Sequence, residues 1–199
     1  MRPVRPARAQ RYAGALAALT AAVVLSIGAS ARSSATVVVA KDFTALCAEA
    51  DLVFVGTVTG VESAWRDASK RSIETRVSFG DLTWLRGTGA VKVTLRFAGG
   101  EMDGVREEIA GVPRFSVGDR RVVFARDGDF LSPVVGFDQG LFRVVDGAAG
   151  PVVQDVEGNA VVGVGRAALQ RGTPGDREHA LPLDVFLDRV RAQLEQDGR

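Results

Sequence analysis

The chain has few of the residues on which most enzyme sites depend. Among its 199 residues there is one cysteine, Cys47, and one histidine, His179. A single cysteine cannot form a disulfide within the chain, and a single histidine excludes a metal centre built from several histidines. Neither the Gly-x-Ser-x-Gly motif of a hydrolase nucleophile nor the Gly-x-x-x-x-Gly-Lys-Ser/Thr motif of a phosphate loop occurs. We therefore expect no metal, no cofactor and no catalytic residues.

Three short patterns resemble sites but have simpler interpretations. Cys47 and His179 are the residue types of a thiol–imidazole pair, yet nothing beside them in sequence indicates an activated thiol, so we favour a buried cysteine and an exposed histidine. The Asp127-Gly-Asp129 segment has the oxygen donors of a calcium loop and equally the pattern of a hairpin turn. Residues 163–168 imitate a dinucleotide loop, but Gly172 and Pro174 would break the helix that must follow, which favours a strand end.

The only long apolar run lies at the amino terminus. Arginines begin the chain, an apolar segment covers 13–27, and Ala29-Ser30-Ala31 fits the small-x-small pattern that signal peptidases cleave. The run is short for a membrane span, and no cysteine follows it at lipidation distance. We predict a signal peptide over 1–31, with cleavage possible to 35, no retained transmembrane anchor, and export to the periplasm or the outside of the cell.

Removal of this leader changes the charge of the chain. The whole sequence has 25 basic and 24 acidic residues, and residues 1–31 hold four arginines and no acids, so 32–199 has 21 basic and 24 acidic residues, a net charge of −3. No concentrated basic block remains to neutralise phosphates, which excludes nucleic acid from the expected partners. The length of 32–199 is that of one domain.

Periodicity predicts a strand-rich domain framed by two helices. Residues 42–50 fit a short helix that buries Cys47, and residues 182–196 fit a longer helix with one apolar face. A strand from residue 52 should bend at Gly56 and Gly60, and the alternation over 73–84 changes phase at Gly80-Asp81, which predicts a β-bulge. Further strands are expected at 91–97, 105–109, 121–125, 134–137, 141–145, 152–156 and 160–164, and a surface loop or linker at 165–180. We predict a mainly β, antiparallel OB-like barrel.

Four segments in the middle of the chain carry a family resemblance. They are 50–58, Gly99-Gly100, 111–119 with its Gly-x-Pro-x-Phe-x-x-Gly-Asp pattern, and 135–144. In these the chain, over 42–196, resembles an uncharacterised family of exported bacterial proteins. In its plan it resembles the netrin-like OB-fold domain of tissue inhibitors of metalloproteinases. Those inhibitors use an amino-terminal cysteine, whereas this mature chain would begin at Arg32 or Thr36, so their mechanism is not carried over.

The long connection from Gly99 to Asp119 is the predicted contact surface. Its charged residues, together with a later turn, form the candidate binding rim: Glu101, Asp103, Arg106, Glu108, Arg114, Asp138 and Gln139. Residues expected to shape the turns, with Phe115 closing one end of the barrel, are Gly99, Gly100, Gly111, Pro113, Phe115, Gly118, Gly136 and Gly140. Glu107 and Glu108 should point to opposite faces.

These features favour a non-catalytic binding or interaction module of the cell envelope. Its expected partner is a protein or a small envelope ligand. The alternative is a secreted hydrolase or a protease-related factor that acts like an inhibitor. Converging acids in a groove or an activated Cys47 would favour the enzyme, whereas a filled barrel with a charged rim would favour the binding module.

Overall fold

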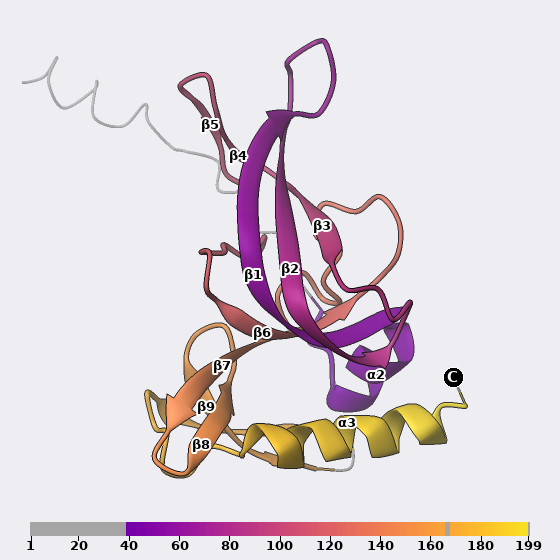
Figure 1. Ribbon diagram of the computed structural model, residues 1–199, viewed down its shortest axis with the longest axis vertical. Helices are drawn as coiled ribbons and strands as arrows, with labels where there is room; N and C mark the ends of the chain where they lie inside the picture. Colours follow the sequence, from indigo (N-terminus) through magenta and orange to yellow (C-terminus); the bar gives the residue numbers. More distant parts are fainter. Residues whose placement is uncertain (1–38, 166–167, 199) are drawn as a thin grey trace, which may run out of the picture. The chain divides into compact units, whose positions relative to one another are not determined.

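The computed structural model describes residues 39–165 and 168–198, so the predicted leader and cleavage site lie outside the described residues. Within these ranges there are two helices, α2 (Phe43–Glu49) and α3 (Leu183–Gln196). The strands are β1 (Leu52–Trp65), β2 (Ile73–Arg86), β3 (Val93–Ala98), β4 (Gly100–Met102), β5 (Val105–Glu107), β6 (Arg120–Ala125), β7 (Leu141–Gly147), β8 (Gly150–Gln154), β9 (Asn159–Val164) and β10 (Leu169–Pro174) (Figure 1).

Eight of these strands form one sheet, in the order β10-β9-β8-β7-β6-β1-β2-β3, and every pairing in it is antiparallel. Strands β4 and β5 form a separate hairpin. The sheet is not closed, because its end strands β3 and β10 are not paired with each other in the part of the chain described. The predicted mainly β, antiparallel fold with two helices is confirmed. The predicted barrel closure is not.

Strand β1 is long and bent because its pairing with β2 slips. Val55 pairs with Thr83 but Thr57 pairs with Gly80, so β2 carries one extra residue at this point. Asp81 has a φ of 50°, which is the left-handed conformation of a bulge residue. Phe79 before the bulge and Trp84 after it consequently face the same apolar cluster. The phase change read from the sequence is therefore confirmed as a β-bulge.

The sheet has an apolar cluster on each face. The first, called the helix-side cluster, joins both helices to the sheet and comprises Phe43, Leu46, Cys47, Ala50, Val53, Val55, Val122, Phe124, Val135, Phe142, Val153, Val161, Leu183, Phe186, Leu187, Val190 and Leu194. The second, called the strand cluster, comprises Phe54, Val58, Val77, Phe79, Leu95, Phe97, Val123, Ala125, Val134 and Leu141. Side chains of β1 and β6 alternate between the clusters, which is why both strands are apolar at successive residues.

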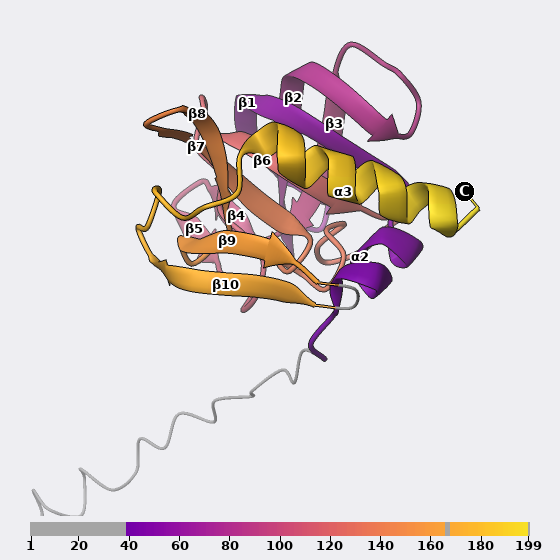
Figure 2. The same ribbon diagram turned by 90° about the horizontal axis from the view of Figure 1, so that it is seen from below.

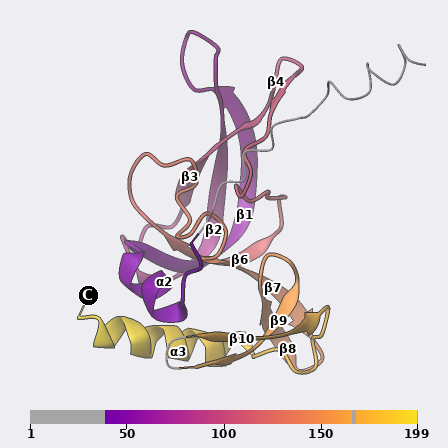
Figure 3. The same cartoon turned by 180° about the vertical axis from the view of Figure 1, so that it is seen from behind.

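The helices cover one face of the sheet. Helix α3 lies across the strands with α2 beside it (Figure 2), and the view from behind shows β7 to β10 near α3 while β1 and β2 extend away from it (Figure 3). The apolar stripe predicted for the last helix, from Leu183 to Leu194, is buried as expected. Asp42 caps α2 by accepting a hydrogen bond from Ala45 N at 2.7 Å.

Arg86 fastens the other end of α2. Its Nη1 atom, at the end of β2, donates to the carbonyl oxygens of Cys47 and Ala50 at 2.7 and 2.8 Å. These carbonyls end the short helix and have no partner further along it. Cys47 itself is fully buried in the helix-side cluster, as predicted.

Three local predictions are wrong. The segment 165–180 was expected to be a loop but contains β10, which pairs with β9 at the sheet edge and tolerates Pro174 there. The segment 134–137 is not a strand, because Gly136 and Phe137 have φ values of 65° and 68° that turn the chain after a single bridge between Val134 and Ala125. The strand expected at 91–97 begins only at Val93, and Val91, which was predicted to face the core, is 91 % exposed.

Candidate functional site

The hairpin formed by β4 and β5 folds directly onto β1 and β2. The chain enters it through Gly99 and Gly100, whose φ values are 87° and 144°. A Cβ atom at Gly100 would lie 2.5 Å from Thr75 Oγ1 and 2.6 Å from Ser63 Oγ, so this approach requires glycine. The glycine pair read from the sequence therefore places the hairpin against the sheet.

Side-chain contacts hold this hairpin at both ends. At its base Glu107 Oε2 accepts a hydrogen bond from Ile73 N at 2.6 Å, and Thr75 Oγ1 donates to Gly99 O at 2.7 Å. At its tip Trp65 Nε1 donates to Asp103 Oδ2 at 2.9 Å, and Lys70 Nζ lies 3.4 Å from the same oxygen. These hydrogen bonds lower the pKa of Asp103. The hairpin is thus attached to β1, to β2 and to the turn between them.

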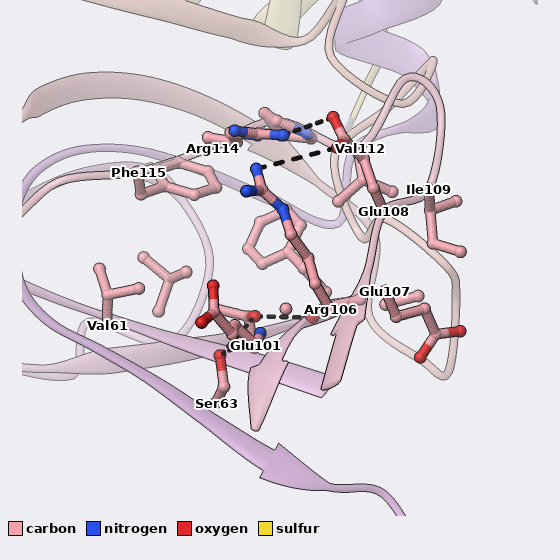
Figure 4. A pocket seen from close by; sticks show the side chains of 17 residues that line it. Val61, Ser63, Glu101, Arg106, Glu107, Glu108, Ile109, Val112, Arg114 and Phe115 are labelled. Atoms are coloured by element: carbon pink, nitrogen blue, oxygen red, sulfur yellow. Dashed lines mark hydrogen bonds and ion pairs between the residues drawn. The ribbon is translucent and has the colours of Figure 1, made fainter. Parts of the chain in front are cut away.

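A pocket of about 310 Å³ lies between this hairpin, the sheet and the following loop (Figure 4). Its apolar floor and walls are Val61, Val77, Phe97, Ala98, Ile109, Val112, Pro113 and Phe115. Its polar lining is Ser63, Thr75, Gly99, Gly100, Glu101, Arg106, Glu107, Glu108 and Arg114. Val77 and Phe97 belong to the strand cluster, so the floor of the pocket is continuous with the core.

Phe115 forms one wall of the pocket and part of the core at once. Its ring centroid is 4.9 Å from that of Phe97 and 5.8 Å from that of Phe79, with the second pair edge to face. The loop that carries it turns at Gly111 and Gly118, with φ values of 81° and 93°. Phe115 packs against the strand cluster, but because the sheet is not closed, the prediction that it closes one end of a barrel is not confirmed.

The charged side chains of the rim lie on two sides of the pocket. Arg114 donates to Glu108, and Arg106 Nη2 lies 3.9 Å from the other oxygen of that carboxylate. Figure 4 shows these three side chains together, with Glu101 beside Ser63 on the other side. Within the described residues the Glu101 carboxylate makes no hydrogen bond and no ion pair. Two guanidinium groups therefore share one carboxylate, and a second carboxylate is unpaired.

The structure brings together four of the seven predicted rim residues: Glu101, Arg106, Glu108 and Arg114. Asp103 lies at the hairpin tip and does not line the pocket. Asp138 and Gln139 were wrongly included in the rim. Gln139 instead bonds the chain before α2, accepting from Lys41 N at 2.7 Å and donating to Val39 O at 3.1 Å.

Asp138 belongs to a different electrostatic neighbourhood. Burial raises its pKa, and the nearby charge of Asp155 adds to that rise. Gly136 shapes the same turn with positive φ, whereas Gly140 has ordinary φ, and a Cβ there would lie 3.0 Å from Phe124 O. This turn packs against β6 and takes no part in the pocket.

The pocket floor was missed by sequence reasoning. Val61 and Ser63 of β1, Thr75 and Val77 of β2, and Phe97 of β3 come from strands whose alternation was recognised, but alternation does not tell which strands are neighbours. Two features of the sequence could have indicated the floor. These residues occupy the inward-facing positions of their strands, and the long connection that covers them begins directly after β3.

Two of the three acidic side chains of the pocket, those of Glu107 and Glu108, are already engaged, whereas that of Glu101 is not. Glu107 bonds Ile73 N while Glu108 contacts Arg114, so the two neighbours point to opposite sides as expected. Among the described residues no group of three or more histidine, cysteine, aspartate or glutamate side chains is arranged to hold a metal ion. Asp129 pairs with Arg66, which fits the turn interpretation of its segment.

Cys47 and His179 do not form a catalytic pair. The pKa of the Cys47 thiol is raised to about 12, mainly by burial and also by the nearby charge of Asp197, while the charge of Arg86 acts in the opposite direction. The His179 ring is exposed and its Nδ1 lies 3.0 Å from Asp176 Oδ2. The cysteine is therefore a core residue and the histidine a surface residue.

No helix within 39–165 and 168–198 combines the length and apolar character needed to cross a membrane. Comparison of the chain with protein-family models, with curated proteins and with solved structures finds no match. The pocket under hairpin β4–β5, with the residues that line it, is therefore the candidate functional site.

Proposed function

We propose that this chain is an exported, non-catalytic binding protein of the cell envelope, and that its ligand site is the pocket under hairpin β4–β5. The observation that carries the proposal is an apolar floor continuous with the core, surrounded by a charged rim. A volume of about 310 Å³ is that of a small ligand site, since such pockets range from about 300 to 1,000 Å³. It accommodates one bulky apolar group with a polar attachment.

The composition of the pocket supports binding of an apolar group. Val61 is 37 % exposed on the wall, and the adjoining Phe115 is only partly buried. A ligand that covers about 100 Å² of such surface gains roughly 2–3 kcal/mol from the hydrophobic effect. Because hairpin β4–β5 is already held by Ile73, Trp65 and Lys70, little ordering accompanies binding.

The same pocket gives little support to the alternative of a secreted hydrolase. A general acid needs a carboxyl group whose environment favours the protonated form. Glu108 instead forms ion pairs with two arginines, and Glu107 accepts a backbone hydrogen bond, so neither carboxylate lies free in the pocket. An inhibitor-like role would need a feature that reaches a protease site, and Cys47 is buried.

The finer fold assignment is also part of this proposal. In an OB barrel the first strand pairs with the second and the fourth, and the barrel closes where the third meets the fifth. The order β7-β6-β1-β2-β3 has the same neighbours without that closure. One backbone hydrogen bond, from Ala98 N to Leu131 O at 2.7 Å, joins the end of β3 to the segment after β6. We infer an opened OB-like sheet extended by β8, β9 and β10.

This fold assignment agrees with the position of the pocket. OB folds bind ligands on the face of their second and third strands. Here β2 supplies Thr75 and Val77, and β3 supplies Phe97 and Ala98. Export is inferred from the basic and apolar leader at 1–31, and the net charge of −3 for 32–199 is compatible with an envelope protein that does not bind nucleic acid.

A fragment screen by NMR tests the ligand site. We expect amide shifts of the mature protein, without the leader, to change at 61–63, 75–77, 97–101 and 106–115 when apolar fragments bind. The Val61→Lys variant places a charge at the pocket wall and should lose these changes. Val91→Lys makes the same substitution at a residue that is 91 % exposed and outside the pocket, and should retain them. Equal binding by both variants would disprove the proposed site.

A further inference from the structure

We propose that the pocket binds a small hydrophobic carboxylate, a molecule with one apolar group and one anionic carboxylate, and that Glu108 occupies the carboxylate position in the free protein. This inference rests on the proposed function and names its ligand class. It is argued from the arrangement of Arg106, Arg114 and Glu108 above the apolar floor.

The two arginines hold more positive charge than Glu108 neutralises. Arg114 contacts one oxygen of the Glu108 carboxylate, and Arg106 Nη2 stands 3.9 Å from the other, which is longer than a hydrogen bond. Within the described residues neither guanidinium has another acidic partner. The two guanidinium groups therefore retain unused N–H donors, which are complementary to a carboxylate, and Glu101, directly across the hairpin from Arg106, forms no ion pair with it.

Glu108 can leave this position at low cost. Its side chain is 65 % exposed, and those of Arg106 and Arg114 are 60 % and 67 % exposed, so both ion pairs are screened by water. Exposed ion pairs of this kind contribute little to stability. An incoming carboxylate replaces one that is already weakly held, and Glu108 becomes solvated.

The apolar floor explains why a ligand would outcompete the protein's own glutamate. The floor residues Val77 and Phe97, with the wall residues Val61 and Phe115, offer surface that Glu108 does not cover. A ligand that fills this surface also displaces water from around the arginines and strengthens their contact with its carboxylate. The unpaired carboxylate of Glu101, across the hairpin from Arg106 and beside Ser63, disfavours a second anionic group there. One apolar group and one carboxylate thus match the apolar floor and the two arginines above it.

The size of the pocket favours a free small molecule over a polypeptide. About 310 Å³ accepts a single phenyl-sized group with a short chain. The probes are therefore 4-phenylbutyrate, its amide, and the corresponding amine, each titrated by NMR into the mature protein at low salt. A tripeptide that ends in phenylalanine with a free carboxylate is the polypeptide probe.

We expect 4-phenylbutyrate to bind about tenfold more tightly than its amide, and the amine to bind no better than the amide. Arg114→Gln should weaken 4-phenylbutyrate binding about fivefold, whereas Glu108→Gln should strengthen it severalfold by removing the competing carboxylate. The preference over the amide should shrink at high salt, since the arginines are exposed.

Two matched substitutions serve as controls. Arg96→Gln changes a residue next to Phe97 that faces away from the pocket, and Glu62→Gln changes one between Val61 and Ser63 that also faces away. Neither should change affinity for 4-phenylbutyrate. Unchanged melting temperatures in all four variants would show that differences in affinity are not losses of folding.

The outcomes separate this inference from the proposed function. If the amide binds as well as 4-phenylbutyrate and both are lost in Val61→Lys, the pocket binds ligands but the carboxylate assignment is wrong. If Glu108→Gln weakens binding, the displacement argument is wrong. If the tripeptide binds more than tenfold tighter than 4-phenylbutyrate, the ligand is a polypeptide terminus and the small-molecule assignment is overturned. If no apolar probe binds and Val61→Lys changes nothing, the proposed function fails as well.

Discussion

Replacing Gly100 by alanine should destabilise the protein more than the same replacement at Gly104 in the same hairpin. Both residues have positive φ, 144° and 78°, which side chains rarely adopt. A Cβ atom at Gly100 would lie 2.5 Å from Thr75 Oγ1 and 2.6 Å from Ser63 Oγ, whereas a Cβ atom at Gly104 has nothing within 4 Å. The two variants therefore share a backbone cost but differ in steric contact.

The size of the difference follows from these two costs. Strained backbone conformation costs about 1–3 kcal/mol at either position. Overpacking adds a further cost of about 1–3 kcal/mol at Gly100 only. We expect Gly100→Ala to lower the free energy of unfolding by about 2–6 kcal/mol and Gly104→Ala by about 1–3 kcal/mol. The excess at Gly100 measures how closely hairpin β4–β5 approaches the sheet.

Urea denaturation followed by tryptophan fluorescence measures both variants. The chain has two tryptophans. Trp65 contacts the tip of hairpin β4–β5 and Trp84 packs against Phe54, so the fluorescence reports on both ends of the β1–β2 pair. Adding Ser63→Ala should recover part of the loss in Gly100→Ala and none in Gly104→Ala. Equal destabilisation of the two glycine variants, or no recovery with Ser63→Ala, would refute the close approach.

Three further predictions concern charged and ionisable groups. Arg86→Ala should lower the free energy of unfolding by about 2–4 kcal/mol, because two carbonyls that end α2 lose charge-assisted hydrogen bonds, while the exposed Arg96→Ala changes it little; chemical denaturation measures both. The pKa of Cys47 rises from 9.0 to about 12 on folding, so the folded state keeps a proton that the unfolded state loses. Stability should therefore fall as pH rises from about 9 to 12, a trend absent in Cys47→Ala, and folded protein should resist thiol labelling at pH 8; rapid stoichiometric labelling would contradict this. At Asp119 burial raises the pKa, but bonds from Ser116 N and Arg121, with the charges of Arg121 and Arg143, lower it overall. That contribution to stability is present above pH 3.8 and lost as pH falls below it, and acid titration of Asp119→Asn should show a shallower loss.

Regular patterns in the sequence were enough to predict most of the elements. Alternation placed β2 and β3, a short apolar run placed β6, and the apolar spacing of Leu183 to Leu194 placed α3 on the core. The bulge at Gly80-Asp81 could be predicted because a one-residue slip moves every later side chain to the other face. Such local signals depend on neighbours in sequence only.

Elements without a local signal were missed or misjudged. Strand β10 has the sequence Leu-Gln-Arg-Gly-Thr-Pro, which has the composition of a loop and is a strand only because β9 offers it an edge. The contact of Glu108 with Arg106 and Arg114, and the placement of Gln139 beside Lys41, depend on how distant segments meet. The rim was therefore only partly predictable.

The two apolar clusters share strands β1 and β6, and this has a consequence for how the protein opens. In β1, Val53 belongs to one cluster and Phe54 to the other, and in β6 the same holds for Phe124 and Val123. Neither cluster can therefore come apart without disrupting strands that also form the other. The slowest amide protons to exchange with solvent should be those of these strands, released only when the whole domain unfolds. The pocket lies further along β1, at Val61 and Ser63, outside this shared region. Its rim can consequently change in sequence, and with it the ligand that we propose it binds, while the cooperative centre of the domain is preserved.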